Sequence, residues 1–236
     1  PNGAINHPLE SWTTLAALAA VTKRIKLATL VTCYAYRRPT VSAKMATTVD
    51  IISGGRLIFG IGAGWHIEEF NGFMGRFPPA KERLQGLRET IEICRSMFAN
   101  ERTTYHGKLY TVNKVLNSPQ PVQKPIPIMV GGSGEKVTLK IAAQHADISH
   151  LFAADLKELE HKLSVLKNHC HAVGRDYNTI RKATSMNLDN LETPNAMEKT
   201  VNVIRDYKNR GIGLITFRFS NLSDLEAFSK KIMPQF

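Results

Sequence analysis

The chain has 236 residues, of which 43% are hydrophobic and 22% are charged. These values are ordinary for a globular protein with a buried core, and one domain over residues 1–236 is the simplest organisation. No apolar run approaches the roughly twenty residues that a membrane-spanning helix needs, and the first residues lack a signal-peptide pattern. We therefore expect a cytoplasmic protein without a membrane partner.

The formal net charge is +11, and the chain carries three cysteines. The positive residues are dispersed and no basic stripe is interleaved with aromatic residues, so we expect no nucleic-acid partner. A polyanionic small molecule would suit such a surface, although solvated lysines alone also explain it. Cys33, Cys94 and Cys170 lack the spacing of metal ligands, and we expect no metal site.

Helix and strand patterns alternate in the first half of the chain. The predicted elements are a helix over 11–22, a strand over 26–32, a helix over 40–52, a strand over 56–62 and a long amphipathic helix over 80–100. Residues 101–125 break this rhythm, because they resemble a small hairpin followed by a proline-rich stretch. We interpret them as a surface excursion within the domain.

The alternation resumes after the proline-rich stretch. The predicted elements are strands over 128–130, 146–151, 180–188 and 214–219, and helices over 136–144, 156–172, 193–210 and 223 to about 233. Strands and helices in such alternation require an α/β fold with a parallel sheet and right-handed crossovers. Either an open doubly wound sheet or a TIM (β/α)8-type barrel satisfies this pattern.

Two features favour the barrel. The strands are continuously apolar, as barrel strands are, and a glycine-rich turn comes late in the chain instead of after the first strand. A full barrel has about eight strands and only about six are predicted, so we expect a β-α-β unit to be absent at the amino end. A first residue that is Pro1, not Met, fits an amino-terminally truncated domain.

The glycine-rich turn is the most informative segment. A short buried strand ends at Val130 and runs into residues 131–134, which read Gly-Gly-Ser-Gly, before a helix that is predicted from Lys136. Small side chains leave the backbone N–H groups accessible, and the start of a helix adds a partial positive charge. The pattern is typical of a phosphate site, although a plain turn between strand and helix also explains it.

Two other loops follow predicted strands. Residues 33–39 gather a thiol, two phenols and two guanidinium groups, and residues 60–69 begin with small residues that would let a flat ligand approach the backbone. In the second loop Trp65 would shield the ligand, and His66 or Glu69 would transfer protons; a histidine that only starts a helix also explains His66. Because no nucleophile elbow or strong acid–base pair is present, we expect a bound cofactor to supply the chemistry.

The sequence resembles the luciferase-like monooxygenase superfamily, and within it the F420-dependent oxidoreductases. The resemblance follows the chain from about Pro8 to Phe236. The segments that carry it are 26–32 with 36–39, 50–57, 60–65, 121–132 and 142–147.

The resemblance implies a TIM barrel with a flavin or deazaflavin across the carboxyl ends of its strands. It also implies a non-proline cis peptide bond at Thr32-Cys33, contacts from Gly62 and Ala63 to the ring system, and a phosphate on the glycine turn. The implied cofactor-binding residues are Thr32, Cys33, Gly62, Ala63, Trp65, Gly131, Gly132, Ser133 and Gly134. Coenzyme F420 carries a phosphate and a polyglutamate tail, which suit a chain of charge +11.

The function that the resemblance implies is hydride transfer between F420 and an unidentified small organic substrate, with His66 and Glu69 as candidate catalytic residues. An FMN-dependent monooxygenase and a non-catalytic, truncated flavin-binding barrel are the alternatives. Sugar-phosphate dehydrogenases of the family have a catalytic glutamate where this chain has Trp65, and the family's amino-terminal catalytic segment is not in this sequence. The family also implies a homodimer, formed through the small-residue helices over 13–20 and 42–48.

Overall fold

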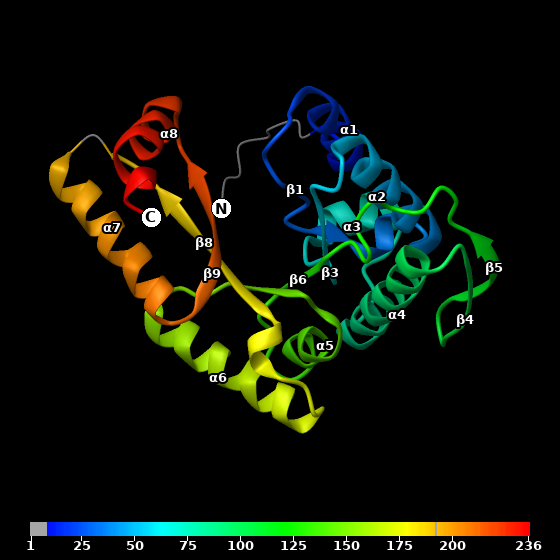
Figure 1. Ribbon diagram of the computed structural model, residues 1–236. Helices are drawn as coiled ribbons and strands as arrows, with labels where there is room; N and C mark the ends of the chain where they lie inside the picture. The colour runs from blue at the N-terminus through cyan, green and yellow to red at the C-terminus, as the bar shows by residue number, and fades with distance from the viewer. Residues whose placement is uncertain (1–8, 192) are drawn as a thin grey trace. The chain divides into compact units, whose positions relative to one another are not determined.

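The computed structural model describes residues 9–191 and 193–236 (Figure 1). Contacts divide these residues into two compact units, each with part of the parallel sheet. The first unit contains the described residues up to Gly132 together with Gln144–Asp147, and the second contains Ser133–Ala143 and Ile148–Phe236. The single domain expected from the sequence stays a prediction.

The first unit is built around strand β3. Its parallel neighbours are β1 and β2 on one side and β6 on the other. The strands of this sheet are β1 (Leu27–Ala28), β2 (Thr32–Cys33), β3 (Leu57–Gly62) and β6 (Ile128–Gly131). The helices of the unit are α1 (Ser11–Val21), a 3-10 turn (Tyr34–Tyr36), α2 (Pro39–Ser53), α3 (Ile67–Met74) and α4 (Ala80–Ala99).

The strand predicted over 26–32 is interrupted. The chain leaves the ladder between β1 and β2, where the Thr29 hydroxyl donates to the carbonyl of Gly60 at 2.6 Å. The non-proline cis peptide bond lies here, at Leu30-Val31. Its predicted position at Thr32-Cys33 is therefore wrong by two residues. Helix α3 was not predicted at all, because it begins within a loop whose glycines suppress the helical pattern.

Buried polar groups hold the segment 50–57 in place. The Arg56 guanidinium donates to the carbonyls of Ala19 and Thr22, at 2.8 and 2.9 Å, and so satisfies the last carbonyls of α1. The Asp50 carboxylate accepts from the backbone N–H and the side-chain amide of Gln123, at 3.0 and 2.7 Å. These residues of the family-like segment therefore have structural roles.

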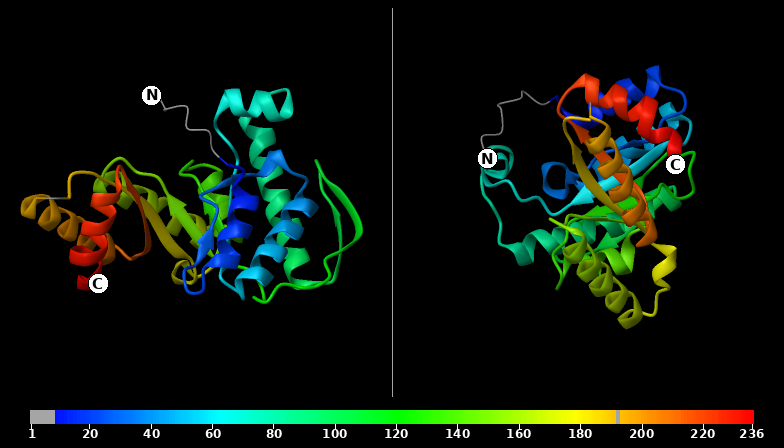
Figure 2. Two further views of the ribbon diagram at one scale, coloured as in Figure 1. Left: turned by 90° about the horizontal axis from the view of Figure 1, so that it is seen from above. Right: turned by 90° about the vertical axis from the view of Figure 1, so that its left-hand side faces the viewer.

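The predicted excursion contains a hairpin of β4 (Arg102–His106) and β5 (Thr111–Leu116), which lies beside α4 (Figure 2). The fully buried Glu89 of α4 accepts hydrogen bonds from the N–H groups at the hairpin turn, Lys108–Tyr110. Burial alone would raise the pKa of Glu89, but hydrogen bonds from Gln85 and from these N–H groups hold it below its usual value. The prediction of a hairpin is confirmed.

The second unit carries three adjacent parallel strands. They are β7 (Ile148–Leu151), β8 (Arg181–Leu188) and β9 (Ile212–Phe219). Its helices are α5 (Thr138–His145), α6 (Leu156–Ala172), α7 (Pro194–Asn209) and α8 (Leu222–Ala227), the last continuing as a π-helical turn (Phe228–Ile232) and a 3-10 turn (Met233–Gln235). A further 3-10 turn (Tyr177–Thr179) precedes β8.

Strands β8 and β9 differ from the expected pattern. Strands β3 and β6 are almost fully buried, as predicted, but apolar and polar residues alternate over the carboxyl-terminal halves of β8 and β9. Their apolar face packs against α7 and α8, which lie beside the two strands in Figure 1. The apolar residues on this face are Met186, Leu188, Ile215, Phe217 and Phe219. Continuous apolarity was therefore a wrong expectation for these two strands.

Since β1 and β2 occupy one position beside β3, the described residues supply six parallel strand positions, β1/β2, β3, β6, β7, β8 and β9. The expectation of about six strands in β/α alternation is confirmed. None of the described helices combines the length and the apolar character that a membrane crossing requires.

The substitution Glu89→Gln should lower the free energy of unfolding by about 2 kcal/mol, because a neutral amide accepts the hairpin's N–H groups more weakly than a carboxylate does. Urea denaturation measures the difference. Glu101→Gln is the control, since Glu101 is exposed and its side chain forms no hydrogen bond with the part of the chain that the structure describes. Equal losses in the two variants would contradict this role of Glu89.

Candidate functional site

Val31 lies against glycines at the carboxyl ends of two strands. A Cβ on Gly62 would be 2.8 Å from Val31 Cγ2, and a Cβ on Gly131 would be 2.7 Å from Val31 Cγ1. Both positions therefore need glycine so that the half-buried Val31 can occupy this space. Sequence analysis missed Val31, although the glycines on β3 and β6 were the signal for a close approach.

The neighbouring Thr32 faces a different partner. It is buried, and its hydroxyl accepts a hydrogen bond from the Trp12 indole at 3.4 Å. Its side chain therefore belongs to the core, and a contact between Thr32 and a cofactor stays a prediction. Ala63 is half-buried, and its contact with a ring system stays a prediction as well.

Cys33 and the loop after β3 pack together. Gly64 has φ 74°, and a Cβ there would lie 2.6 Å from Cys33 Sγ. Only glycine fits this position, for its backbone conformation and for the space that the thiol occupies. Burial raises the pKa of the Cys33 thiol, which therefore stays protonated near neutral pH and is a poor nucleophile.

The structure brings the two candidate proton-transfer residues together at the start of α3. His66 caps the helix, because its Nδ1 accepts the N–H of Glu69 at 3.2 Å. The neutral imidazole of His66 therefore carries its proton on Nε2. Glu69 Oε2 in turn accepts the phenol hydrogen of Tyr36 at 2.9 Å, and burial followed by this hydrogen bond raises the pKa of Tyr36. Trp65 is 81% exposed, with its ring 5.3 Å from that of His66.

The glycine turn differs slightly from its prediction. Helix α5 begins at Thr138, two residues after the predicted start at Lys136. Gly132 has φ 137°, and a Cβ on Gly134 would lie 2.8 Å from the Thr138 hydroxyl oxygen. Gly132 is thus required by its backbone conformation, whereas Gly134 leaves room for the Thr138 side chain. The peptide bond between Gly132 and Ser133 also joins the two units, and the rest of the turn belongs to the second unit.

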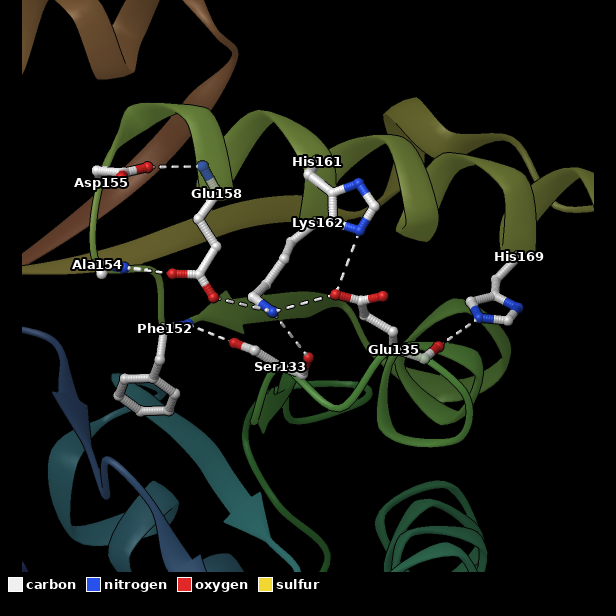
Figure 3. Close-up of polar contacts among 9 residues, drawn as sticks. All are labelled: Ser133, Glu135, Phe152, Ala154, Asp155, Glu158, His161, Lys162 and His169. Atoms are coloured by element: carbon white, nitrogen blue, oxygen red, sulfur yellow. Dashed lines mark hydrogen bonds and ion pairs between the residues drawn. The ribbon is translucent and has the colours of Figure 1, made fainter.

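Ser133 is held by two groups from the second unit (Figure 3). Its hydroxyl oxygen accepts the N–H of Phe152 at 2.6 Å, and its carbonyl accepts from the Lys162 ammonium at 3.4 Å. Because the hydroxyl acts as an acceptor toward Phe152, its own hydrogen remains free for an anionic ligand. At the start of α5 the N–H of Leu139 donates to the carbonyl of Gly134 at 3.0 Å, so an anion would meet the N–H groups that come before it. The turn therefore fits a phosphate group.

Lys162 is only 8% exposed, and carboxylates balance its charge. Its Nζ lies 3.2 Å from Glu158 Oε1 and 3.4 Å from Glu135 Oε1 (Figure 3). The N–H of Ala154, and then Lys162, lower the pKa of Glu158. His161, and then Lys162, lower the pKa of Glu135. The ammonium therefore positions the turn, and a bound anion would depend on the N–H groups and the Ser133 hydroxyl.

A buried histidine lies on β7, at the edge of the same unit's sheet. His150 is fully buried, its Nε2 is 3.0 Å from the Ser185 hydroxyl, and its ring is 4.7 Å from that of Phe152. Its Nδ1 has no hydrogen-bond partner within residues 9–191 and 193–236. Burial lowers the pKa of His150 to about 4, so the ring is neutral near pH 7. Sequence analysis gave His150 no role. No group of His, Cys, Asp or Glu side chains among the described residues could hold a metal ion.

Comparison with known proteins places the chain in a family. The model of the luciferase-like monooxygenase family matches residues 2–221. The chain belongs to the luciferase-like monooxygenase family. A solved structure of an F420-dependent secondary alcohol dehydrogenase with an F420–acetone adduct covers 96% of this chain and 84% of its own, with a TM-score of 0.85 and 18% identity. That likeness confirms the expected fold, of the TIM (β/α)8-barrel type.

The alignments with sequence relatives cover a smaller share of each relative than the structural alignment covers of its neighbour. An uncharacterized protein of Mycobacterium tuberculosis is 32% identical over 75% of this luciferase-like chain and 61% of the relative. The pyrimidine monooxygenase RutA of Acinetobacter baylyi is 33% identical over 74% of this chain and 48% of the relative. The chain thus spans about half to three fifths of the length of these relatives.

The substitution Lys162→Met should loosen the glycine turn, because the carbonyl of Ser133 loses a donor and two carboxylates lose their shared cation. We expect a melting temperature several degrees lower, measured by circular dichroism, and faster amide hydrogen exchange in residues 133–137. Lys167→Met is the matched control on the same helix, since Lys167 is exposed and unpaired among the described residues. Unchanged exchange in Lys162→Met would contradict the positioning role.

His150 should make stability depend on pH. Between its ordinary pKa of 6.5 and its folded value of about 4, the unfolded chain binds a proton that the folded chain does not. The free energy of unfolding should therefore decrease as pH falls through this window, by up to about 3 kcal/mol from this residue. Urea denaturation at several pH values should give a shallower dependence for His150→Gln than for the exposed control His171→Gln. Parallel curves for the two variants would refute the assignment.

Proposed function

We propose that this luciferase-like protein is an oxidoreductase that binds coenzyme F420 and transfers a hydride between it and a small organic substrate. The observation that carries the proposal is the turn after β6, where the Ser133 hydroxyl keeps a free hydrogen while the N–H of Phe152 and the Lys162 ammonium fix its position. A phosphate group is the ligand that this arrangement suits best. The fold neighbour that binds an F420–acetone adduct supports the choice of F420.

The proposed phosphate-binding residues are Gly131, Gly132, Ser133 and Gly134. The proposed ring-binding residues are Val31, Cys33, Gly62, Ala63 and Trp65, with Thr32 through its backbone. Val31 adds to the set predicted from sequence, because it is half-buried and seated on Gly62 and Gly131. An apolar side chain held rigidly at this place would support one face of a planar ring and exclude water from it. The bound deazaflavin would supply the hydride chemistry.

Proton transfer is assigned to the start of α3. The Nε2–H of neutral His66 is a donor that no described residue uses, since only Nδ1 takes part in the helix cap. Glu69 Oε2 accepts the phenol hydrogen of Tyr36, which orients the Glu69 carboxylate, and the raised pKa of Tyr36 keeps this hydrogen on the phenol. We propose that either His66 or Glu69 exchanges a proton with the substrate.

A monooxygenase with FMN is the second candidate. It is favoured by the 33% identity to the pyrimidine monooxygenase RutA. The same turn would take the phosphate of FMN, and bound FMN would then supply oxygen activation. For either candidate function we also propose that the protein is cytoplasmic and forms a homodimer. An open apolar depression on α1 and α2, lined among others by Trp12, Ala16 and Val41, supports the homodimer.

Titration with fluorescence detection tests the proposal. We expect saturable binding of F420, at least tenfold tighter than that of FMN and of the deazaflavin riboside that lacks phosphate and tail. Ser133→Ala should weaken F420 binding about tenfold and leave the riboside unchanged, because a charge-assisted hydrogen bond to phosphate contributes about 1.5 kcal/mol.

Two control variants sharpen this test. Ser133→Thr retains the hydroxyl and should restore most of the affinity, and Ser164→Ala removes an exposed serine of α6 that has no described side-chain partner. Tighter binding of FMN than of F420 would favour the monooxygenase. If neither cofactor bound with saturation, both candidates would be rejected.

A further inference from the structure

One face of β8 and β9 is polar over their carboxyl-terminal halves, and neither of the apolar clusters described for the second unit includes its residues. In the parallel register Ser185 pairs with Thr216 and Asn187 pairs with Arg218. Because side chains alternate along a strand, these four lie on the face opposite Phe217 and Phe219. We call them, with His150 of β7, the polar face. The remaining question is what its free groups bind.

Hydrogen bonds along the polar face leave one buried ring nitrogen without a partner. The Thr216 hydroxyl lies 2.7 Å from the Ser185 hydroxyl, 3.5 Å from His150 Nε2 and 3.3 Å from the carbonyl of Thr184. The Ser185 hydroxyl in turn lies 3.0 Å from His150 Nε2. The buried Nδ1 of the same ring has no hydrogen-bond partner among the described residues. Such a group indicates that the polar face is completed by a ligand or by water.

The polar face ends in an unpaired cation. Arg218 is exposed at the carboxyl end of β9, and among the described residues it has neither an ion pair nor a hydrogen bond. Its register partner Asn187 is likewise exposed and without a partner. The nearby Asp189 accepts the hydroxyl hydrogen of Ser220 and forms no ion pair with Arg218. Two other arginines of this unit are engaged, since Arg181 donates to the carbonyl of Gly213 and Arg210 pairs with Glu160, whereas Arg205 of α7 has no described side-chain partner either.

We propose that Asn187 and Arg218 bind an oxyanion group of the substrate, a carboxylate or a phosphoryl group. A guanidinium fork donates two parallel hydrogen bonds to such a group, and the neighbouring amide adds a third donor. The carboxyl ends of parallel strands are where barrel enzymes bind substrates. This inference rests on the proposed function, because it takes the bound molecule to be the substrate of the oxidoreductase. It predicts that this substrate is an anionic small molecule.

The test follows the Nε–Hε signal of Arg218 in proton–nitrogen NMR spectra, assigned through its loss in Arg218→Gln. Succinate and inorganic phosphate are the probes, and each is titrated without F420 and with F420 present. We expect a saturable shift of the Arg218 signal with one or both probes, and the tighter probe identifies the group. Asn187→Ala should weaken that binding at least fivefold. The signal of Arg205, an exposed arginine of α7 without a described partner, should not saturate.

The outcomes separate this inference from the proposed function. A shift that does not saturate, or equal shifts at Arg218 and Arg205, would mean that the probes only sense the net positive charge and would overturn the site. Displacement of the probe by F420 would assign Arg218 to the cofactor and overturn the substrate role. If F420 failed to bind while Arg218 still bound a probe, the proposed function would fail and the oxyanion site would stand.

Discussion

A buried ammonium group sets the geometry of the glycine turn. Lys162 reaches the carbonyl of Ser133 from α6, while Glu135 and Glu158 neutralise its charge. A buried lysine is costly unless it is paired, and here the pairing also determines where the turn lies. With its carbonyl fixed, Ser133 presents its hydroxyl hydrogen without further adjustment. Binding of the phosphate that we propose here would then require little ordering of the chain, which is the advantage of a preorganised site.

The first unit uses the same principle with different groups. Its buried Asp50, Arg56 and Glu89 are each surrounded by hydrogen-bond partners, and each fixes a loop or a helix end. Glycines have the complementary role. They are found where a side chain from another strand must enter, as Val31 does between Gly62 and Gly131. The resulting scaffold places the apolar side chain of Val31 at the ends of β3 and β6, and the side chains of His66 and Glu69 at the start of α3.

Much of this arrangement could be predicted from the sequence. The β/α alternation, the hairpin, and the glycine turn follow local patterns, and the structure confirms them. The break between β1 and β2 could not be predicted, because the apolar residues of 26–32 fit a continuous strand. The offset of α5 to Thr138 has a similar reason, since Lys136 and Val137 are compatible with a helix and only the tertiary contacts of Glu135 exclude them.

The site residues that sequence analysis missed share one physical feature. Val31, Lys162 and His150 acquire their roles from contacts between elements that are distant in the chain, and none has a local motif. Alternation in β9 was visible in the sequence, with Thr216 and Arg218 between apolar residues, but it was read as part of an apolar strand. A polar residue that alternates with buried ones in a parallel strand was the signal for the polar face.

The most direct test of the account is a crystal structure of this chain grown with F420. The account predicts phosphate oxygens about 3 Å from the Ser133 hydroxyl and from backbone nitrogens of the glycine turn, with Lys162 still bonded to the Ser133 carbonyl. A structure in which F420 is ordered but its phosphate lies away from residues 131–134 would contradict the central claim.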